Sequence, residues 1–419
     1  MWTSRHPSKP NRRRRLLFVC FADSPHAQSW LELTRDTEFE VRVFASPVNY
    51  GSLYPPRPWT VSTYVLVRPH IPRTANRVLS LLPGAPWLLP PVEWLAHRFD
   101  LGCRWLRWII STWKPDVVHT LRLNPEAWLT WQALEGIPKG RRPKWIVSSW
   151  GSDISIEATS PDIRERLERV LYHCDGFIAD CRRDLQLALA AGLAPSKVAL
   201  EDPVPTTGGL NLDEFSLGES HGRDRNMIVI PKAYEGPYNK TLPILEALRL
   251  AEGALVGYEV HLLMASWEVK MWLSRMSESL RQRCQCHHML PHQELMAMLT
   301  RARVMIATSL SDGTPNVMLE AMAAGALPLM SPIDSVQEWI ENGSNGLLAP
   351  ALYPDQIATA LQRALTDDDL LHAARRINWQ IVSQRADRKR IRRQVLDYYR
   401  SLLGHSDIWN SSVASSPKT

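Results

Sequence analysis

The sequence lacks the features of membrane-spanning and disulfide-rich proteins. Among its 419 residues no run of 18 or more is uninterruptedly apolar, which argues against a transmembrane helix. The best candidate, residues 78–96, contains four prolines and Glu93, and that many prolines would break a spanning helix. Six unevenly placed cysteines do not make a disulfide framework in a chain of this length, so we expect a reducing compartment.

Several motifs for cofactors and metals are absent as well. No G-x-G-x-x-G and no G-x-x-x-x-G-K-[ST] occurs, which argues against a dinucleotide-dependent dehydrogenase and a P-loop nucleotidase. No H-E-x-x-H and no C-x-x-C pair occurs either. Residues 284–288 (Cys-Gln-Cys-His-His) offer soft metal ligands, with Cys286 and His288 on one face of an extended strand, but no second ligand pair lies nearby. We interpret this run as structural and predict neither a metal nor a cofactor.

What is present is an ordinary globular composition, with 45% apolar and 22% charged residues. The length suits two domains of about 200 residues, each large enough for its own core. Four arginines at 12–15 precede the apolar residues 16–22, as in a signal peptide, but the apolar stretch is short and runs into Asp23 and His26. We therefore predict a basic arm leading into a first strand, in a cytoplasmic protein.

Charge is concentrated in the first half of the chain. Residues 1–200 hold 27 Lys and Arg against 18 Asp and Glu, a net charge of +9, and the remainder has a net charge of −3. This balance favours an anionic partner such as a phospholipid surface, a nucleic acid or a phosphorylated substrate, although four of the charges could simply be a solvated tail. Tryptophans in the same half favour peripheral contact with the inner membrane face and no nucleic acid, but their near-helical spacing is also typical of a core-facing helix. They are Trp87, Trp94, Trp105, Trp108 and Trp113.

Short apolar runs alternate with helical patterns in both halves, which indicates parallel βαβ units. The sequence predicts strands at 16–22, 40–45, 116–120, 145–149, 176–180, 227–231, 259–265, 304–308 and 327–330. It predicts helices at 27–35, 93–113, 126–134, 164–171, 183–191, 242–251, 269–284, 293–302 and 316–324, and a helical segment from Tyr353 onward. The fold class is therefore α/β, with two doubly wound Rossmann-like domains facing an interdomain cleft.

The expected division of the chain follows from these patterns and from a segment rich in Pro, Gly and acidic residues near residue 210. It comprises a basic arm (1–15), an N-terminal domain (16–205), a linker (206–222), a C-terminal domain (223–385), a final helix (386–404) and a disordered tail (405–419).

The segment 309–325 is the most informative for chemistry. A strand leads into a short loop, Thr314 can cap a helix with Pro315 at its first position, and Gly325 ends that helix. Asn316 and Glu320 share a face near the helix start. Free N–H groups there suit an anionic or hydroxyl-rich ligand, and carboxylates can accept hydrogen bonds from sugar hydroxyls. The segment therefore predicts a phosphosugar or nucleotide site.

The same segment resembles the signature of the family 4 retaining glycosyltransferases, which have the GT-B fold: an acidic residue, Gly, x and Pro, and then Glu-Ala-Met-Ala-x-Gly. Asp312 and Glu320 stand at the spacing of that family's paired glutamates. Residues 338–348 match its E-x-I-x-x-G-x-N-G-L-L run, and residues 114–119 (Lys-Pro-Asp-Val-Val-His) and 150–153 (Trp-Gly-Ser-Asp) match looser landmarks. The resemblance spans nearly the whole chain.

This resemblance implies roles for individual residues. Glu320 would bind the donor ribose, and Asp312 with the N–H groups of 313–316 would hold the donor sugar. Lys232 and Lys240 would clamp the diphosphate and stabilise its developing charge without a metal. The implied nucleotide-sugar site comprises Lys232, Lys240, Asp312, Gly313, Thr314, Pro315, Asn316 and Glu320.

Other positions depart from the family pattern or carry looser assignments. Asp312 replaces a Glu, Lys232 stands where Arg is usual, and the first strand–helix loop lacks the usual glycines. His119, at a strand end, would act on the donor or acceptor sugar, or would be a packing residue. Acceptor binding would fall to His26, Arg122 and Asp153.

The resulting expectation is a retaining, metal-independent hexosyltransferase that moves a sugar from a nucleotide-diphosphate sugar, with a UDP-sugar favoured. Its acceptor would be a saccharide or a lipid-linked molecule, in bacterial surface polysaccharide or glycolipid synthesis. The N-terminal domain would bind the acceptor and the C-terminal domain the donor. Two alternatives remain open: a hydrolase or epimerase of the same fold, and a non-catalytic glycan-binding subunit.

Overall fold

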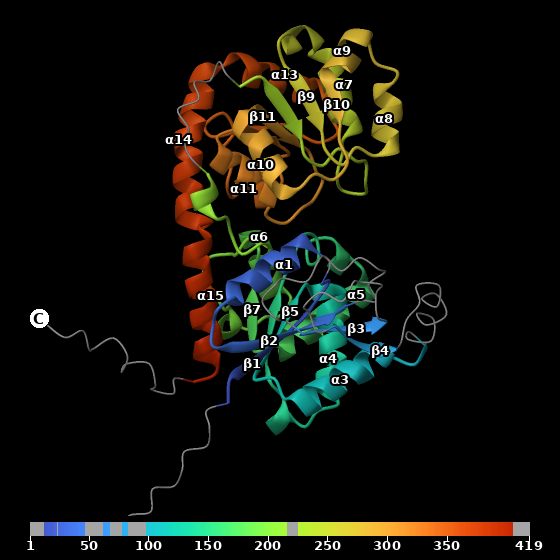
Figure 1. Cartoon of the computed structure of the whole chain (residues 1–419), viewed down its shortest axis with the longest axis vertical. Helices are drawn as coiled ribbons and strands as arrows, with labels where there is room; N and C mark the ends of the chain where they lie inside the picture. Colours follow the sequence, from blue (N-terminus) through green and yellow to red (C-terminus); the bar gives the residue numbers. More distant parts are fainter. Residues whose placement is uncertain are drawn as a thin grey trace, which may run out of the picture.

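The structure, a computed structural model, describes residues 12–22, 24–46, 62–67, 78–82, 98–215 and 225–404. It contains two α/β domains, one above the other, with the last two long helices running along one side of both (Figure 1). Each domain is built on a parallel sheet, and the predicted fold class is confirmed. Among the described residues, no helix is long and apolar enough to cross a membrane.

The N-terminal domain has a seven-stranded parallel sheet in the order β4-β3-β2-β1-β5-β6-β7. The side chains from Leu16 to Cys20 on β1 are all fully buried, because helices cover both faces of the sheet. The strands are β1 (Arg14–Cys20), β2 (Phe39–Ala45), β3 (Ser62–Val67), β4 (Val78–Leu82), β5 (Val117–Leu121), β6 (Lys144–Ser148) and β7 (Gly176–Ile178). The sequence analysis did not predict β3 and β4.

One helix of this domain, α3 (Leu101–Trp113), shows whether its tryptophans face the core or the solvent. In α3, Trp105 and Trp113 are buried in the core, and Trp108 is 60% exposed. The described part of the tryptophan-rich segment is therefore mainly a core-facing stripe, and Trp87 and Trp94 lie outside the described residues. The main helices are α1 (Pro25–Leu31), α3 (Leu101–Trp113), α4 (Trp128–Glu135), α5 (Pro161–His173) and α6 (Arg182–Ala190).

The C-terminal domain has a six-stranded parallel sheet in the order β10-β9-β8-β11-β12-β13. Its strands are β8 (Met227–Ile230), β9 (Glu259–Leu262), β10 (Cys284–Cys286), β11 (Ala302–Ala307), β12 (Leu327–Met330) and β13 (Leu347–Leu348). Its helices include α7 (Leu242–Leu250), α8 (Trp267–Leu273), α9 (Glu278–Arg283), α10 (His292–Arg301), α11 (Asn316–Ala324), α12 (Asp334–Gln337) and α13 (Pro354–Thr366).

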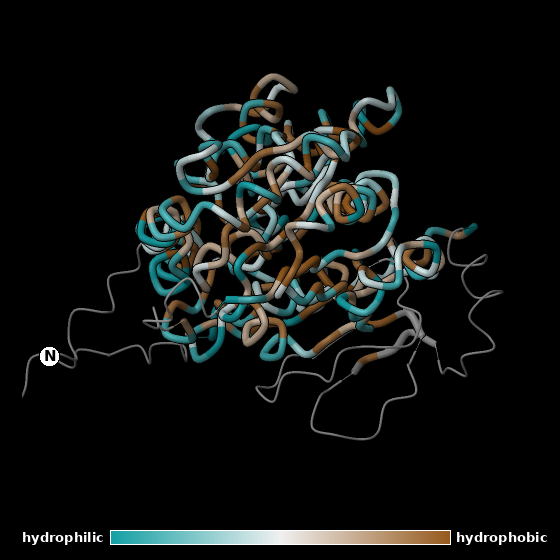
Figure 2. Tube along the Cα trace, turned by 90° about the horizontal axis from the view of Figure 1, so that it is seen from above, coloured by the Kyte–Doolittle hydropathy of each residue, from teal (hydrophilic) through white to brown (hydrophobic). Residues whose placement is uncertain are grey.

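The single helix predicted at 269–284 is wrong in two respects. The chain forms two helices there, because the Ser277 side chain accepts a hydrogen bond from the Leu280 N–H and so caps a new helix, α9. The last residue of the predicted helix, Cys284, instead begins β10, beside β9. In Figure 2 the peripheral helices alternate between teal and brown along the tube, as expected for amphipathic helices over a buried sheet.

The two long C-terminal helices connect the domains. Helix α14 (Asp368–Arg385) packs on the C-terminal domain, and α15 (Arg388–Leu402) packs on the N-terminal domain. On α15, Ile391, Val395 and Tyr399 are buried in the same apolar cluster as Leu16 and Phe18 of β1. The carboxyl ends of strands in both sheets consequently meet at the interface between the domains, where doubly wound folds bind ligands. The predicted arm and tail lie outside the described residues, apart from residues 12–15.

Candidate functional site

The loop after β11 leads into α11 and approaches the N-terminal domain. Helix α11 begins at Asn316 and ends at Ala324, as predicted, and Gly325 adopts a left-handed φ of 77°. Thr314 does not cap this helix, and Pro315 takes the cap position. The Thr314 hydroxyl instead donates to the Asp180 carbonyl oxygen at 2.6 Å, in the other domain. The correction has a physical reason: the hydroxyl makes an interdomain hydrogen bond in place of a local one.

Lys232 and Asp312 form the charged centre of the site. Lys232 follows β8, and its Nζ donates to Asp312 Oδ2 at 2.8 Å. Burial lowers the pKa of Lys232, but the neighbouring Asp312 carboxylate more than offsets this, so the pKa is raised overall. Lys232 therefore keeps its positive charge in a half-buried position, with 33% of its side chain exposed.

Lys240 lies beside the same strand end. Its backbone N–H donates to the Thr308 carbonyl, and its Nζ donates to the Gly236 carbonyl at 2.7 Å and lies 3.1 Å from Glu235 Oε1. The side chain is 19% exposed. The structure thus brings both predicted lysines to the edge formed by β8 and β11, the two central strands of the sheet.

Glu320 lies one turn inside α11 and has a partner that the sequence analysis missed. Its Oε1 is 2.8 Å from His292 Nε2, at the start of α10. The Glu320 side chain is 11% exposed and the His292 side chain 58%. The hydrogen bond to Glu320 is the main reason why the pKa of His292 is raised. His292 is 28 residues upstream in the chain, and no spacing pattern links the two.

Asn316 joins three segments at the start of α11. Its side chain donates to the Thr206 hydroxyl at 2.6 Å and accepts from the Thr207 hydroxyl at 2.7 Å. His26 Nδ1 of α1 lies 3.4 Å from both the Asn316 amide nitrogen and the Thr206 hydroxyl. Burial, assisted by the Lys232 charge and opposed by that of Asp312, lowers the pKa of His26. His26 is therefore a neutral, polar group of the N-terminal domain that faces the charged centre.

Direct hydrogen bonds join the two domains near the loop between β11 and α11, and none of them was predicted from the sequence. The Ser152 and Ser311 hydroxyls lie 2.9 Å apart, and Arg183 donates to the Asp312 carbonyl at 2.9 Å. Glu338 of the C-terminal domain accepts the N–H groups of Arg182 and Arg183 at 2.9 and 3.1 Å, and so caps α6.

Gly313 lies so close to the N-terminal domain that a Cβ there would be 2.0 Å from Asp180 Oδ2 and 2.9 Å from the Gly151 nitrogen. A glycine is therefore required at this position for the observed approach of the domains.

Arg122 lies at the carboxyl end of β5, among three carboxylates. Its guanidinium is 3.4 Å from Asp153, 3.7 Å from Glu157 and 3.9 Å from Glu126. Its backbone has a φ of 104°, a strained value for a residue other than glycine. Burial raises the pKa of Asp153 to about 8 and that of Glu126 to about 7, against the opposing charge of Arg122. The group combines a fixed cation with carboxyl groups that titrate near neutral pH.

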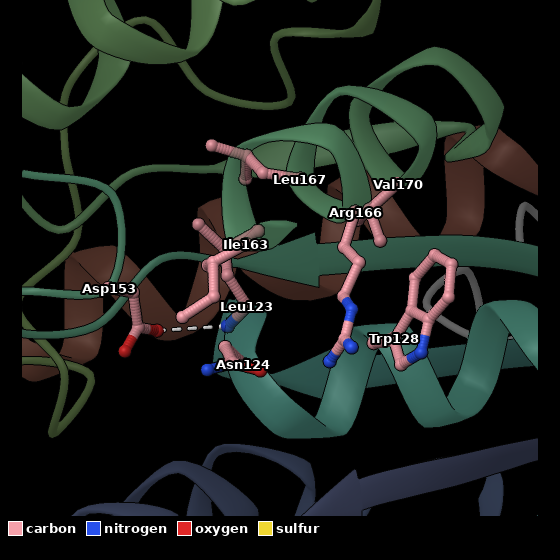
Figure 3. Close-up of a pocket in the computed structure, with 8 residues that line it drawn as sticks. All are labelled: Leu123, Asn124, Trp128, Asp153, Ile163, Arg166, Leu167 and Val170. Carbon is pink, nitrogen blue, oxygen red and sulfur yellow. Dashed lines mark hydrogen bonds between the residues drawn. The ribbon is translucent and has the colours of Figure 1, made fainter. Parts of the chain in front are cut away.

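A small pocket adjoins this group, between α5 and the segment that precedes α4 (Figure 3). Asp153 Oδ2 accepts the Leu123 N–H at 2.9 Å, and the Arg166 guanidinium lies over the Trp128 ring, 5.4 Å from its centroid. Asp153 is only 4% exposed. The structure therefore brings Arg122 and Asp153 together, with Asp153 holding the loop while Arg122 keeps 34% of its side chain exposed.

His119 lies away from the charged centre, and its surroundings favour the packing role over the role on a sugar. The side chain is fully buried, with Nδ1 2.7 Å from the Tyr399 hydroxyl and Nε2 2.8 Å from the Ser148 hydroxyl. Burial lowers its pKa to about 3, so the ring is neutral. Both ring nitrogens are occupied, and His119 links β5 to α15.

Part of the run 284–288 contacts a histidine of β9. His287 Nε2 lies 3.0 Å from His261 Nδ1, and the two rings stack. Within the described ranges, the one group of three metal-ligating side chains is Asp180, Cys181 and Asp184. The sequence analysis did not single out these residues.

Comparison with known proteins adds a family match and a set of structural neighbours. Residues 237–367 match the family described as Glycosyl transferases group 1. No curated protein sequence matches the chain. Among solved structures, HepE of Anabaena, in complex with UDP and glucose, is 14% identical, with a TM-score of 0.65 over 93% of this chain and 100% of that one.

Two further structures are similar in fold. Sucrose-phosphate synthase of Thermosynechococcus elongatus is 17% identical, with a TM-score of 0.68 over 93% of this chain and 99% of that one. The pneumococcal O-GlcNAc transferase GtfA, in complex with UDP and GlcNAc, is 15% identical, with a TM-score of 0.57 over 72% of this chain and 60% of that one. These likenesses support the GT-B arrangement of two domains.

Proposed function

Because residues 237–367 match the glycosyl transferases group 1 family, we propose that the chain transfers a sugar from a nucleotide-diphosphate sugar to a saccharide or lipid-linked acceptor. The transfer retains the configuration at the anomeric carbon. One observation carries this proposal: Lys232, Lys240, Asp312 and Glu320 gather around the loop between β11 and α11.

The donor binds to the C-terminal domain in this proposal. Glu320 accepts hydrogen bonds from the ribose hydroxyls, which requires it to leave His292, 2.8 Å away. Lys232 and Lys240 clamp the diphosphate. Each is now paired with a carboxylate, Asp312 or Glu235, and an ammonium group has three N–H donors, so a phosphate oxygen can join without losing the first partner. Asp312 and the N–H groups of residues 313–316 hold the sugar.

The chemistry rests on electrostatics and orientation. When the bond between the anomeric carbon and the diphosphate oxygen breaks, negative charge develops on that oxygen, and the two fixed ammonium groups stabilise it. The acceptor hydroxyl attacks from the same face, forms the new bond to carbon and gives its proton to the departing phosphate oxygen. No metal or further base is needed to balance this step.

A UDP-sugar is the favoured donor. HepE with UDP and glucose and GtfA with UDP and GlcNAc share the fold of this chain, which supports the choice. A hexose-type sugar is the simplest donor of this kind.

The acceptor binds to the N-terminal domain. Arg122, 34% exposed and held among carboxylates, anchors an anionic or hydroxyl-rich acceptor, and His26 faces the donor sugar across the interface. Asp153 positions the Arg122 loop through the Leu123 N–H. An acceptor carried by a lipid would bring the protein to the inner membrane face as a peripheral protein, in bacterial surface polysaccharide or glycolipid synthesis.

A turnover assay tests the proposal. The full chain is incubated with UDP-, GDP-, ADP- and dTDP-sugars, with and without a mixture of saccharide and lipid-linked acceptors, and nucleotide release is measured. We expect release from one donor that depends on acceptor, and an NMR coupling constant of the product that shows the donor's anomeric configuration. Release that is equally fast without acceptor would indicate a hydrolase, and an inverted product would contradict retention.

A further inference from the structure

Three metal-ligating side chains meet below the interdomain contact, between β7 and α6. Asp180 lies two residues after β7, Cys181 occupies the cap position of α6, and Asp184 lies in its first turn. One ligand atom from each of the three lies within 4.8 Å of the others, and all three residues are buried. Asp180 is 1% exposed, and Cys181 and Asp184 are not exposed at all.

The hydrogen bonding of this trio is incomplete. Asp180 Oδ2 accepts the Gly151 N–H at 3.3 Å, and Asp184 Oδ1 accepts from Arg183 at 2.8 Å. The other oxygen of each carboxylate, Asp180 Oδ1 and Asp184 Oδ2, has no hydrogen-bond partner among the described residues. Buried carboxylate oxygens without a partner are costly, so a missing group is expected beside them.

The two acidic side chains of the trio share a single basic partner. Two carboxylates face one guanidinium, that of Arg183, which is engaged with Asp184 and with the Asp312 carbonyl. Burial and the nearby Asp184 charge hold the pKa of Asp180 well above its ordinary value, so Asp180 keeps its proton when no cation is bound. A bound divalent cation would take the place of that proton and satisfy the unpartnered oxygens.

We propose that Asp180, Cys181 and Asp184 bind a zinc-class divalent cation that stabilises the contact between the two domains. A thiolate with two carboxylates is a donor set of intermediate softness, which suits Zn²⁺ better than Mg²⁺ or Ca²⁺. Zinc ligands about 2.0–2.3 Å from the ion lie roughly 3–4 Å from one another, so a small contraction of the trio completes three positions. A water completes the fourth, and the thiol proton and the proton held by Asp180 are released to solvent on binding.

The proposed cation would lie beside the contact between Asp180 and the loop that precedes α11. The Asp180 carbonyl accepts from Thr314, and its carboxylate lies against Gly313, so the cation fixes the residue on which the donor loop rests. It does not contact the donor in this proposal, and its role is structural. The site is thus independent of the proposed reaction, which needs no metal.

Cobalt and zinc binding to the full chain test the proposal. The metal-stripped protein is titrated with Co²⁺, whose thiolate complex gives a charge-transfer band in the near ultraviolet, and the Zn²⁺ content is then measured after dialysis. We expect one cation per chain, a thiolate band, and a higher melting temperature with Zn²⁺ than with a chelator.

Two variants and a matched control identify the ligands. Cys181→Ser removes the thiolate but keeps a good helix cap, so the fold is expected to persist while the band disappears. Asp184→Asn is expected to lose the cation as well. The control, Cys286→Ser, removes an exposed cysteine near the His261–His287 pair and should leave the band and the stoichiometry unchanged.

Three outcomes would overturn the proposal. The first is the absence of a bound cation in the folded wild-type chain. The second is a thiolate band that survives Cys181→Ser and is lost in Cys286→Ser, which would place the metal on β10. The third is an Asp184→Asn chain that is more stable than the wild type whatever the metal content, because that would show two carboxyl groups sharing a proton.

Discussion

Lys232 and Asp312 form an ion pair, with 2.8 Å between Nζ and Oδ2, that joins the end of β8 to the loop after β11. The two residues are 80 positions apart in the chain, and the order of the parallel sheet, in which β8 and β11 are neighbours, brings them together. The pair holds a positive charge where the diphosphate of a donor would lie.

Replacing Lys232 is expected to affect catalysis more than folding. Lys232→Ala should lower kcat/KM for the donor by about 100-fold or more, because a fixed charge that stabilises the leaving group is lost. Lys232→Arg should recover part of the activity. The control is Lys270→Ala, an exposed lysine of the same domain. Steady-state kinetics with parallel thermal unfolding measure both effects, and a folded Lys232→Ala enzyme with normal kcat/KM would rule out the clamp.

Gly313→Ala is expected to open the contact between the domains. The added Cβ would lie 2.0 Å from Asp180 Oδ2 and 2.9 Å from the Gly151 nitrogen, and the backbone atom cannot move aside cheaply. We expect a larger radius of gyration in small-angle scattering and a large loss of turnover, with each domain still folded. Gly253→Ala, where a Cβ would meet nothing within 4 Å, should change neither. Unchanged scattering and turnover in Gly313→Ala would contradict this interface.

Donor binding is expected to strengthen as pH rises through the pKa of His292. That pKa is raised, mainly by the hydrogen bond to Glu320, so the pair contributes stability that is present below the ordinary pKa of about 6.5 and is lost above the raised value. Below it, protonated His292 competes with the ribose for Glu320. Calorimetric titration of the nucleotide between about pH 6 and pH 9 should show a several-fold gain in affinity. The gain should vanish in His292→Gln, and an equal gain in that variant would refute the competition.

His119 is expected to control stability in acid and to have little effect on chemistry. Its pKa of about 3 in the folded chain lies below the unfolded value of about 6.5, so its contribution to stability is present above pH 6.5 and falls as pH drops towards 3. Between pH 7 and pH 5 it should account for a loss of about 2 kcal/mol in the free energy of unfolding.

Urea unfolding of wild type and His119→Leu at both pH values measures this loss. The variant should be less stable at pH 7 but less sensitive to acid, and its remaining turnover per folded molecule should be near normal. Tyr399→Phe, which removes the hydroxyl 2.7 Å from His119 Nδ1 but keeps the ring, should stay as sensitive to acid as the wild type. An acid sensitivity of His119→Leu equal to that of the wild type would show that other groups are responsible.

Much of the fold was predictable because helix ends and buried strands are marked by residues close together in the sequence. The bounds of α11 match the prediction because Pro315 and Gly325 restrict the backbone at its two ends. Strand β12 was also predicted, because it is a short apolar run that follows Gly325. Strand β3 carries a similar signal in its β-branched residues, Thr63, Val65 and Val67, but the prediction missed it.

The site was predictable only in part, because several of its contacts are long-range. Glu320 and Asp312 follow from a compact motif, whereas His292 reaches Glu320, and Asp180 lies against Gly313, from other elements. No spacing in the chain shows that Thr314 donates to Asp180, 134 residues away, rather than to its own helix. The two roles left open for His119 could not be separated from the sequence for the same reason: its partner Tyr399 is 280 residues away.

The most direct test of the central assignment is nucleotide binding to the wild type and to Glu320→Ala. Glu320 is only 11% exposed, but its partner His292 is 58% exposed and can bond to water when the carboxylate is removed, so the variant should fold normally. A matched control is Glu341→Ala, an exposed glutamate of the same domain. Thermal unfolding is measured with UDP, GDP, ADP and dTDP. At 100 times its dissociation constant a ligand adds about 2.7 kcal/mol to the stability of the folded chain.

We predict that one nucleotide raises the melting temperature of the wild type and of Glu341→Ala but not that of Glu320→Ala. An equal shift in all three proteins, or no shift with any nucleotide, would contradict the donor site described above.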